Sequence, residues 1–260
     1  LSRMLRYPNT HVGAEDLRSF KTPFSKSRMF IRKTRSDVSR VCEYVNDIYT
    51  AESYLNEALL AKKPTALIDI GANIGMATLA LLERFPTITQ VYGVEAEPQN
   101  FDVLKKNYSN WENQFKTTDF TPIHAIATHN NEMEFTQSSL ENPQGLTASG
   151  TFQFQKTDSV SSENKVKTQA IAIADIVAQL PEDAVILCKV DIEGGEEYLF
   201  AENTQWMKRM TFLTLELHDR FAPGMLRSSS PVLKAILDYD FAVQPDRDVL
   251  LCYARSLVKS

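Results

Sequence analysis

Two pairs of polar residues, each two positions apart, carry side chains suited to proton transfer. Asp191 and Glu193 follow one apolar run, and Glu216 and His218 lie at the end of another. Residues two apart on an extended segment face the same side, and ligands of open α/β sheets bind at the carboxyl ends of the strands. We therefore expect these four side chains to lie together at the edge of a sheet where a ligand binds.

His218 is the first candidate for a general base, because an imidazole with an ordinary pKa of about 6.5 accepts a proton at neutral pH. Asp191 is the alternative base, with Glu216 as a further catalytic candidate. A simpler reading of His218 is that it ends a strand and hydrogen-bonds Glu216. The set Asp191, Glu193, Glu216 and His218 also has the donor atoms that Mg²⁺ or Mn²⁺ prefers. Metal binding is an alternative, but we expect none.

A strand, a glycine turn and a helix precede these pairs in the chain. The apolar segment Ala66–Ile70 predicts a buried parallel strand, and residues 76–85 predict a helix. The turn between them fits the acid-x-Gly-x-Gly-x-Gly motif of S-adenosylmethionine (SAM) methyltransferases, with Asn73 at the middle glycine. Asparagine tolerates the left-handed conformation that such a turn requires. A dinucleotide fingerprint would need small residues at Asn73 and Met76, which disfavours a dehydrogenase. The candidate cofactor-binding residues here are Asp69, Gly71, Asn73 and Gly75.

The next two strands supply the remaining cofactor contacts that we expect. Residues 90–95 predict a strand that ends in Glu95, where a carboxylate can accept hydrogen bonds from both ribose hydroxyls. Residues 120–127 predict a third strand, whose end usually meets the adenine in a SAM-binding domain. The candidate residues of these strand ends are Glu95, Ala96, Ala125 and Ile126, and Asp191 is a further cofactor contact.

Four sequence motifs, in this order, resemble the FkbM-type methyltransferase family. They are Ile68-Asp69-Ile70-Gly71-Ala72-Asn73-Ile74-Gly75, Val94-Glu95-Ala96-Glu97-Pro98, Lys189-Val190-Asp191-Ile192-Glu193-Gly194-Gly195-Glu196 and Leu215-Glu216-Leu217-His218. The likeness spans roughly residues 31–253. It implies SAM-dependent O-methylation, often of a sugar or natural-product hydroxyl. Gly195 departs from the alanine that is more frequent in the family.

The expected fold is α/β: a Rossmann-like, seven-stranded class I methyltransferase sheet, mostly parallel, whose last strand is antiparallel. We expect an N-terminal arm and helices over residues 1–62, which cover the cleft, and a SAM-dependent methyltransferase domain over residues 63–260. Residues 1–36 look irregular, and helices are predicted after Ser36 and over residues 51–61. The pattern further predicts a hairpin between residues 132–135 and 150–154, a loop over 155–165, and a terminal strand pair over 241–243 and 249–253.

Charge and composition bound the classes of function. The net charge is −5, but the first 40 residues hold ten basic and three acidic residues, a local balance of +7 that leaves −12 for the rest. The basic arm could bind nucleic acid or lie against acidic surface of its own domain or of a partner subunit. We favour the second, because no basic repeat interleaved with aromatics occurs.

The remaining expectations concern compartment, partners and rival functions. No apolar stretch approaches the roughly 18 residues of a membrane span, and three cysteines without a C-x-x-C pair suit a reducing, cytoplasmic setting. We expect a small-molecule or glycan acceptor, no nucleic acid, and leave a homo-oligomer open. A nucleic-acid methyltransferase is disfavoured because Asp191-Ile192-Glu193-Gly194 replaces the Asn/Asp-Pro-Pro-Tyr/Phe run of amino-group enzymes. A non-catalytic SAM-binding interaction protein is the other alternative.

Overall fold

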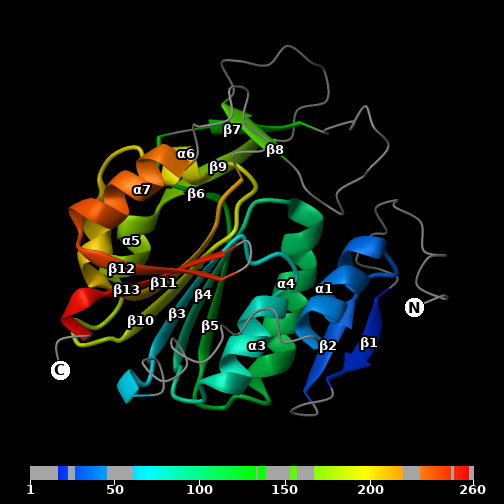
Figure 1. The fold of residues 1–260 in the computed structure, drawn as a ribbon. Helices are drawn as coiled ribbons and strands as arrows, with labels where there is room; N and C mark the ends of the chain where they lie inside the picture. The colour runs from blue at the N-terminus through cyan, green and yellow to red at the C-terminus, as the bar shows by residue number, and fades with distance from the viewer. Residues whose placement is uncertain are drawn as a thin grey trace.

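The computed structural model describes residues 17–22, 27–45, 61–132, 134–138, 153–156, 167–218, 229–246 and 249–257. Within these residues, a seven-stranded sheet has the strand order β12-β13-β11-β10-β3-β4-β5 (Figure 1). Its strands are β3 (Ala66–Ile70), β4 (Gln90–Glu95), β5 (Asp119–His124), β10 (Ile186–Val190), β11 (Met210–Glu216), β12 (Phe241–Asp246) and β13 (Val249–Ala254). β13 is antiparallel to β11 and β12, and the other pairs are parallel. The predicted α/β class I methyltransferase sheet, with its antiparallel last strand and terminal strand pair, is confirmed.

Helices cover both faces of this sheet (Figure 1). One face packs against α1 (Arg35–Val45), α3 (Met76–Arg84) and α4 (Pro98–Glu112), and the other against α5 (Ile173–Ala178), α6 (Glu196–Leu199) and α7 (Ser229–Asp238). Short 3-10 helices, η4 (Thr204–Arg209) and η6 (Arg255–Leu257), follow α6 and β13. Side chains alternate between the two cores, as strand geometry requires: Ile68 and Ile70 face one, and Leu67 faces the other. Every residue of β3 is buried, which explains why four of its five residues are apolar.

The N-terminal segment is more ordered than the sequence predicts. β1 (Arg18–Lys21) and β2 (Arg28–Ile31) form an antiparallel pair inside residues 1–36, which we expected to be irregular. Side chains of α4 hold β2: Asn107 accepts from the Phe30 amide at 2.6 Å, and the Trp111 indole donates to the Arg28 carbonyl at 2.8 Å. These contacts join residues that are far apart in the chain, so no local sequence pattern predicts them.

The first predicted helix is confirmed as α1, whereas most of the second, over residues 51–61, lies outside the described residues. Met29, Val41 and Tyr44 share one core with α3 and α4. The division of the chain at residues 62 and 63 stays a prediction.

A smaller sheet lies beside the carboxyl end of β5. It consists of β6 (Ile126–Thr128), β9 (Lys167–Ala172), β7 (Glu134–Ser138) and β8 (Gln153–Lys156), in that order. The expected single strand over residues 120–127 is therefore wrong: the chain leaves the large sheet after His124, and Ile126 pairs with β9 instead. The predicted hairpin exists as β7 and β8, with its second strand shifted to Gln153–Lys156. The remainder of the predicted loop falls outside the described residues.

The helices of the described part of the chain include none that is both long enough and apolar enough to cross a membrane. Cys188 and Cys252 are buried thiols, and Cys42 is partly buried.

Candidate functional site

The turn between β3 and α3, residues 71–75 and here named the glycine turn, has three residues in left-handed conformations. Their φ angles are 77° at Gly71, 50° at Asn73 and 91° at Gly75. The Asn73 side chain accepts from the Ile74 amide at 2.8 Å, which helps asparagine to hold this conformation. At Gly71, a Cβ atom would lie 1.8 Å from the backbone oxygen of Asp191. Glycine therefore lets β3 and the end of β10 approach each other at this point.

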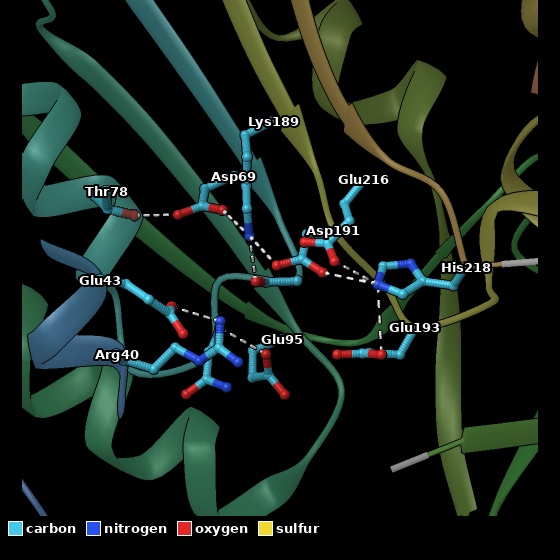
Figure 2. A network of polar contacts seen from close by, with 12 residues as sticks. Arg40, Glu43, Asp69, Thr78, Glu95, Lys189, Asp191, Glu193, Glu216 and His218 are labelled. Atoms are coloured by element: carbon cyan, nitrogen blue, oxygen red, sulfur yellow. Dashed lines mark hydrogen bonds and ion pairs between the residues drawn. The ribbon is translucent and has the colours of Figure 1, made fainter. Parts of the chain in front are cut away.

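Asp69 and Lys189 support the glycine turn from beneath. The fully buried carboxylate of Asp69 accepts from the Thr78 hydroxyl at 2.6 Å and lies 3.3 Å from the Lys189 ammonium. Lys189 also donates to the Gly71 carbonyl at 2.8 Å and lies 3.5 Å from Asp191 (Figure 2). Asp69 is thus held by Thr78 and Lys189, and its predicted contact with the cofactor stays a prediction.

Glu95 ends β4 and lies against the same turn (Figure 2). Its carboxylate is buried and accepts from the amides of Asn73 at 2.7 Å and of Glu97 at 2.9 Å. Glu97 is the N-cap of α4 and accepts from the Asn100 amide at 2.6 Å. Burial raises the pKa of Glu95 to about 7, although the two amides oppose that shift. The strand end therefore places a carboxylate beside the turn, as expected, and its contact with a ribose stays a prediction.

The residues expected beside the adenine lie next to Glu95. Ile126 is buried and packs against Ala96 and Tyr198. Ala125 is buried between β5 and β6, and its amide donates to the Glu95 carbonyl at 3.2 Å. These residues are apolar and lie beyond the end of β4, and their contact with an adenine stays a prediction.

Asp191, Glu193, Glu216 and His218, here named the acid–histidine cluster, meet at the ends of β10 and β11 (Figure 2). His218 Nε2 lies 3.6 Å from an Asp191 oxygen, 3.5 Å from a Glu193 oxygen and 3.4 Å from a Glu216 oxygen. The other ring nitrogen, Nδ1, lies 2.7 Å from the buried carboxylate of Glu196. The expectation that the two pairs occupy adjacent strand ends is confirmed by this geometry.

Comparison with known proteins identifies the family. A family model described as the methyltransferase FkbM domain matches residues 69–242. The chain belongs to the FkbM methyltransferase family. The 31-O-demethyl-FK506 methyltransferase FkbM of Streptomyces tacrolimicus is 23% identical over 224 residues, which cover 78% of this chain and 83% of that protein.

Solved structures match more distantly. Methyltransferase FkbM from Methylobacillus flagellatus KT has a TM-score of 0.46 and 16% identity over 74% of this chain and 44% of that chain, so this chain spans less than half of its length. Magnesium protoporphyrin IX methyltransferase from Synechocystis PCC 6803 with bound SAM has a TM-score of 0.38 and 11% identity, and the match covers 84% of this chain and 82% of that one.

The charges of the cluster in this FkbM-family methyltransferase bear on the role expected of His218. Burial lowers the pKa of His218, but hydrogen bonds to Glu196 and Glu216 and the neighbouring negative charges outweigh burial and raise that pKa to about 10. The imidazole is therefore protonated at neutral pH and cannot accept a further proton. Burial also raises the pKa of Asp191, but Lys189 and His218 lower it more strongly, so Asp191 stays ionised.

Glu193 has the pKa that a base needs near neutral pH. Burial raises the pKa of Glu193 to about 7; the charge of His218 opposes this shift, and Asp191 and Glu216 reinforce it. Its φ of 52° lies in the left-handed region, in the tight turn between β10 and α6. The sequence reading included Glu193 only as a metal-ligand alternative, because no pattern shows which carboxylate burial will affect.

Two further residues of this FkbM-family site have no role in the sequence reading. Glu196 holds His218, and Thr78 holds Asp69. Glu196 follows the glycine pair in a recognised motif, which was the available signal; Thr78 lies inside a helix and gave none.

One donor atom each of Asp191, Glu193 and His218 lies within 4.8 Å of the others, so a divalent cation would fit these three residues.

Proposed function

We propose that this chain is a SAM-dependent O-methyltransferase that acts on a hydroxyl of a small molecule, sugar or natural product. One observation carries the proposal: the glycine turn, Glu95 and the acid–histidine cluster lie at the same edge of the sheet, at the carboxyl ends of β3, β4, β10 and β11. That edge is where open α/β sheets bind ligands. A cofactor held by the turn would thus lie beside groups that can accept a proton from a hydroxyl.

The residues of the edge fit the parts of SAM. Gly71 and Gly75 lie under the expected amino-acid portion, Glu95 faces the ribose, and Ala96 and Ile126 offer an apolar surface to the adenine. When bound, SAM supplies a methyl group on a positively charged sulfur. Asp191, ionised and two residues from Glu193, suits the cofactor's ammonium group. The chain's contribution to methyl transfer is then to align the acceptor oxygen, exclude water and remove its proton.

We assign proton removal to Glu193. One oxygen of Glu193 lies 3.5 Å from His218 Nε2. Its pKa of about 7 lets Glu193 receive a proton at neutral pH. The imidazolium of His218 holds the carboxylates of Asp191, Glu193 and Glu216 near one another, and Glu196 fixes the ring. This division of roles keeps His218 and Asp191 at the site and moves the base to Glu193, which the sequence indicated only as a possible metal ligand.

Cofactor binding tests the proposal directly. In calorimetry, the wild-type chain should bind SAM and show no binding of NAD. Replacement Glu95→Ala should lower SAM affinity by at least about tenfold, because a charge-assisted hydrogen bond to the ribose is lost. The milder Glu95→Gln keeps one acceptor oxygen and should lose less. Binding of NAD in place of SAM would overturn the proposed function, and unchanged affinity in Glu95→Ala would remove Glu95 from the site.

Metal removal tests whether the positive charge among the carboxylates of the acid–histidine cluster is the imidazolium of His218 or a metal ion. We expect full methyl transfer after dialysis against EDTA, because a protonated His218 already supplies a positive charge among the three carboxylates. Wild-type enzyme assayed with and without added Mg²⁺ or Mn²⁺ is the comparison. Loss of activity with EDTA and recovery with either ion would instead make Asp191, Glu193 and His218 metal ligands.

The described part of the basic arm does not favour the alternative function, a nucleic-acid methyltransferase. Arg32 is buried, pairs with Asp37 at 2.7 Å and donates to Asn100 at 2.6 Å. Arg40 pairs with Glu43 at 2.7 Å. The contact of Arg32 with Asn100 of α4 joins the arm to the core of the chain and supports the prediction that the arm lies on its own domain.

A further inference from the structure

Arg40 reaches the site from α1, outside the motifs that define the family. Figure 2 draws it in the same view as the glycine turn and the acid–histidine cluster, and its Nη1 is 2.7 Å from the carboxylate of Glu43 on the next turn of the same helix. Both side chains are about one-quarter exposed, at 24% and 21%. α1 packs on α3, the helix that follows the glycine turn, and Tyr44 hydrogen-bonds Glu83 there. Arg40 is therefore a cation at the border between solvent and site.

The charge of Arg40 acts on the residues of the cluster. Burial raises the pKa of both Asp191 and Glu193, and Arg40 is among the charges that lower it again. The guanidinium is thus close enough to the ends of β3 and β10 to influence a charged group between them. A ligand bound beside Asp191 would therefore also feel the charge of Arg40.

Two other cations are labelled in Figure 2, and both are held within the protein. Lys189 lies beneath the turn and contacts the Gly71 carbonyl and the carboxylates of Asp69 and Asp191. His218 contacts Glu196 and faces the oxygens of the acid–histidine cluster. By contrast, Arg40 is partly exposed. A guanidinium carries five N–H donors in a planar fork, so it can bind Glu43 and a ligand carboxylate at the same time.

We infer that Arg40 binds the α-carboxylate at the amino-acid end of the cofactor, and that Glu43 fixes the guanidinium for this contact. The inference rests on the proposed function and names the residue that holds one group of the proposed cofactor. The amino-acid end is a zwitterion, and Asp191 and Arg40 are a complementary pair of charges: Asp191 for the ammonium and Arg40 for the carboxylate.

The test compares two ligands that differ at one group: S-adenosylhomocysteine and its carboxamide, in which the carboxylate is replaced by a neutral amide. Calorimetry on the wild-type chain should show about tenfold or greater preference for the carboxylate form. Arg40→Gln should lose about tenfold in affinity for S-adenosylhomocysteine and change by less than about twofold for the carboxamide. The matched variant Glu43→Gln keeps the guanidinium and should keep most of the preference.

The outcomes separate the two proposals. If the wild type does not bind S-adenosylhomocysteine, the proposed function fails together with this inference. If it binds both ligands equally, or if Arg40→Gln weakens both equally, the inference fails while the proposed function stands, and Arg40 has only a structural role. Should Arg40→Gln not fold, Arg40→Lys gives the decision: it keeps the charge and loses the fork, so the preference should fall several-fold, and an unchanged preference contradicts the inference.

Discussion

Replacement of Glu193 by glutamine should lower the rate of methyl transfer by about 10²–10⁴-fold, the usual effect of losing a general base, and change SAM affinity little. Glutamine keeps the size of the side chain and cannot accept the proton of the acceptor hydroxyl. Glu193 lies 3.5 Å from His218 Nε2, between the ends of β10 and β11. Turnover with a methyl acceptor and calorimetry with SAM measure the two effects separately.

The pH profile adds a second readout for Glu193. A base must be deprotonated to act, so the wild-type rate should rise with pH through about 7, the raised pKa of Glu193, and then level off. This rise of the rate with pH, the acidic limb of the profile, should be absent in Glu193→Gln. His218→Gln removes a positive charge that lowers the pKa of Glu193, so the limb should move to higher pH.

The control is Glu202→Gln, which removes an exposed acid beyond α6 and should leave both rate and profile unchanged. Near-normal turnover in Glu193→Gln would place the base elsewhere, with Asp191 the next candidate.

Replacement of Gly71 by alanine should destabilise the folded chain by at least about 3 kcal/mol, because strained backbone and steric overlap add at this position. The φ of Gly71 is 77°, and the new Cβ would lie 1.8 Å from the Asp191 carbonyl oxygen. Relief requires β3 and β10 to separate, which also breaks the bond from Lys189 to the Gly71 carbonyl. Urea unfolding measures the loss of stability, and SAM binding should fall with it.

Gly194→Ala is the matched control for this substitution. Gly194 also has a positive φ, 100°, but a Cβ there would have nothing within 4 Å. Its replacement should therefore cost only the conformational strain, about 1 kcal/mol. Equal losses in the two variants would show that the contact between Gly71 and Asp191 is not what requires glycine.

The part of the site that the sequence predicts is the part set by single strands. A buried strand shows its apolar run, and the residue that follows it lies at the ligand edge; this was sufficient for Gly71, Glu95, Asp191 and His218. The neighbouring positions of Asp191 and His218 followed from the strand order of the resembling family. The antiparallel last strand was predicted for the same reason.

What the sequence does not predict depends on contacts between distant segments. The pair β1 and β2 is held by Asn107 and Trp111 of α4, about 80 residues away. The break at Ala125 depends on β9, which pairs with β6 and whose own pattern was not recognised. The raised pKa of His218 depends on Glu196, Glu216 and Glu193, and a shift of this kind arises only when these groups are brought together.

The packing of β13 and of the N-terminal segment bears on how the chain may be shortened. The family match ends at residue 242, yet β13 (Val249–Ala254) lies between β11 and β12 and pairs with both. A fragment trimmed to the match would lose β13 and most of β12 and leave β11 with an open edge, which invites aggregation. Removal of Met29 and Tyr44 would likewise uncover apolar side chains of α3 and α4. The segment shared by relatives is therefore smaller than the unit that folds, and a truncated enzyme for crystallisation should keep residues 17–257.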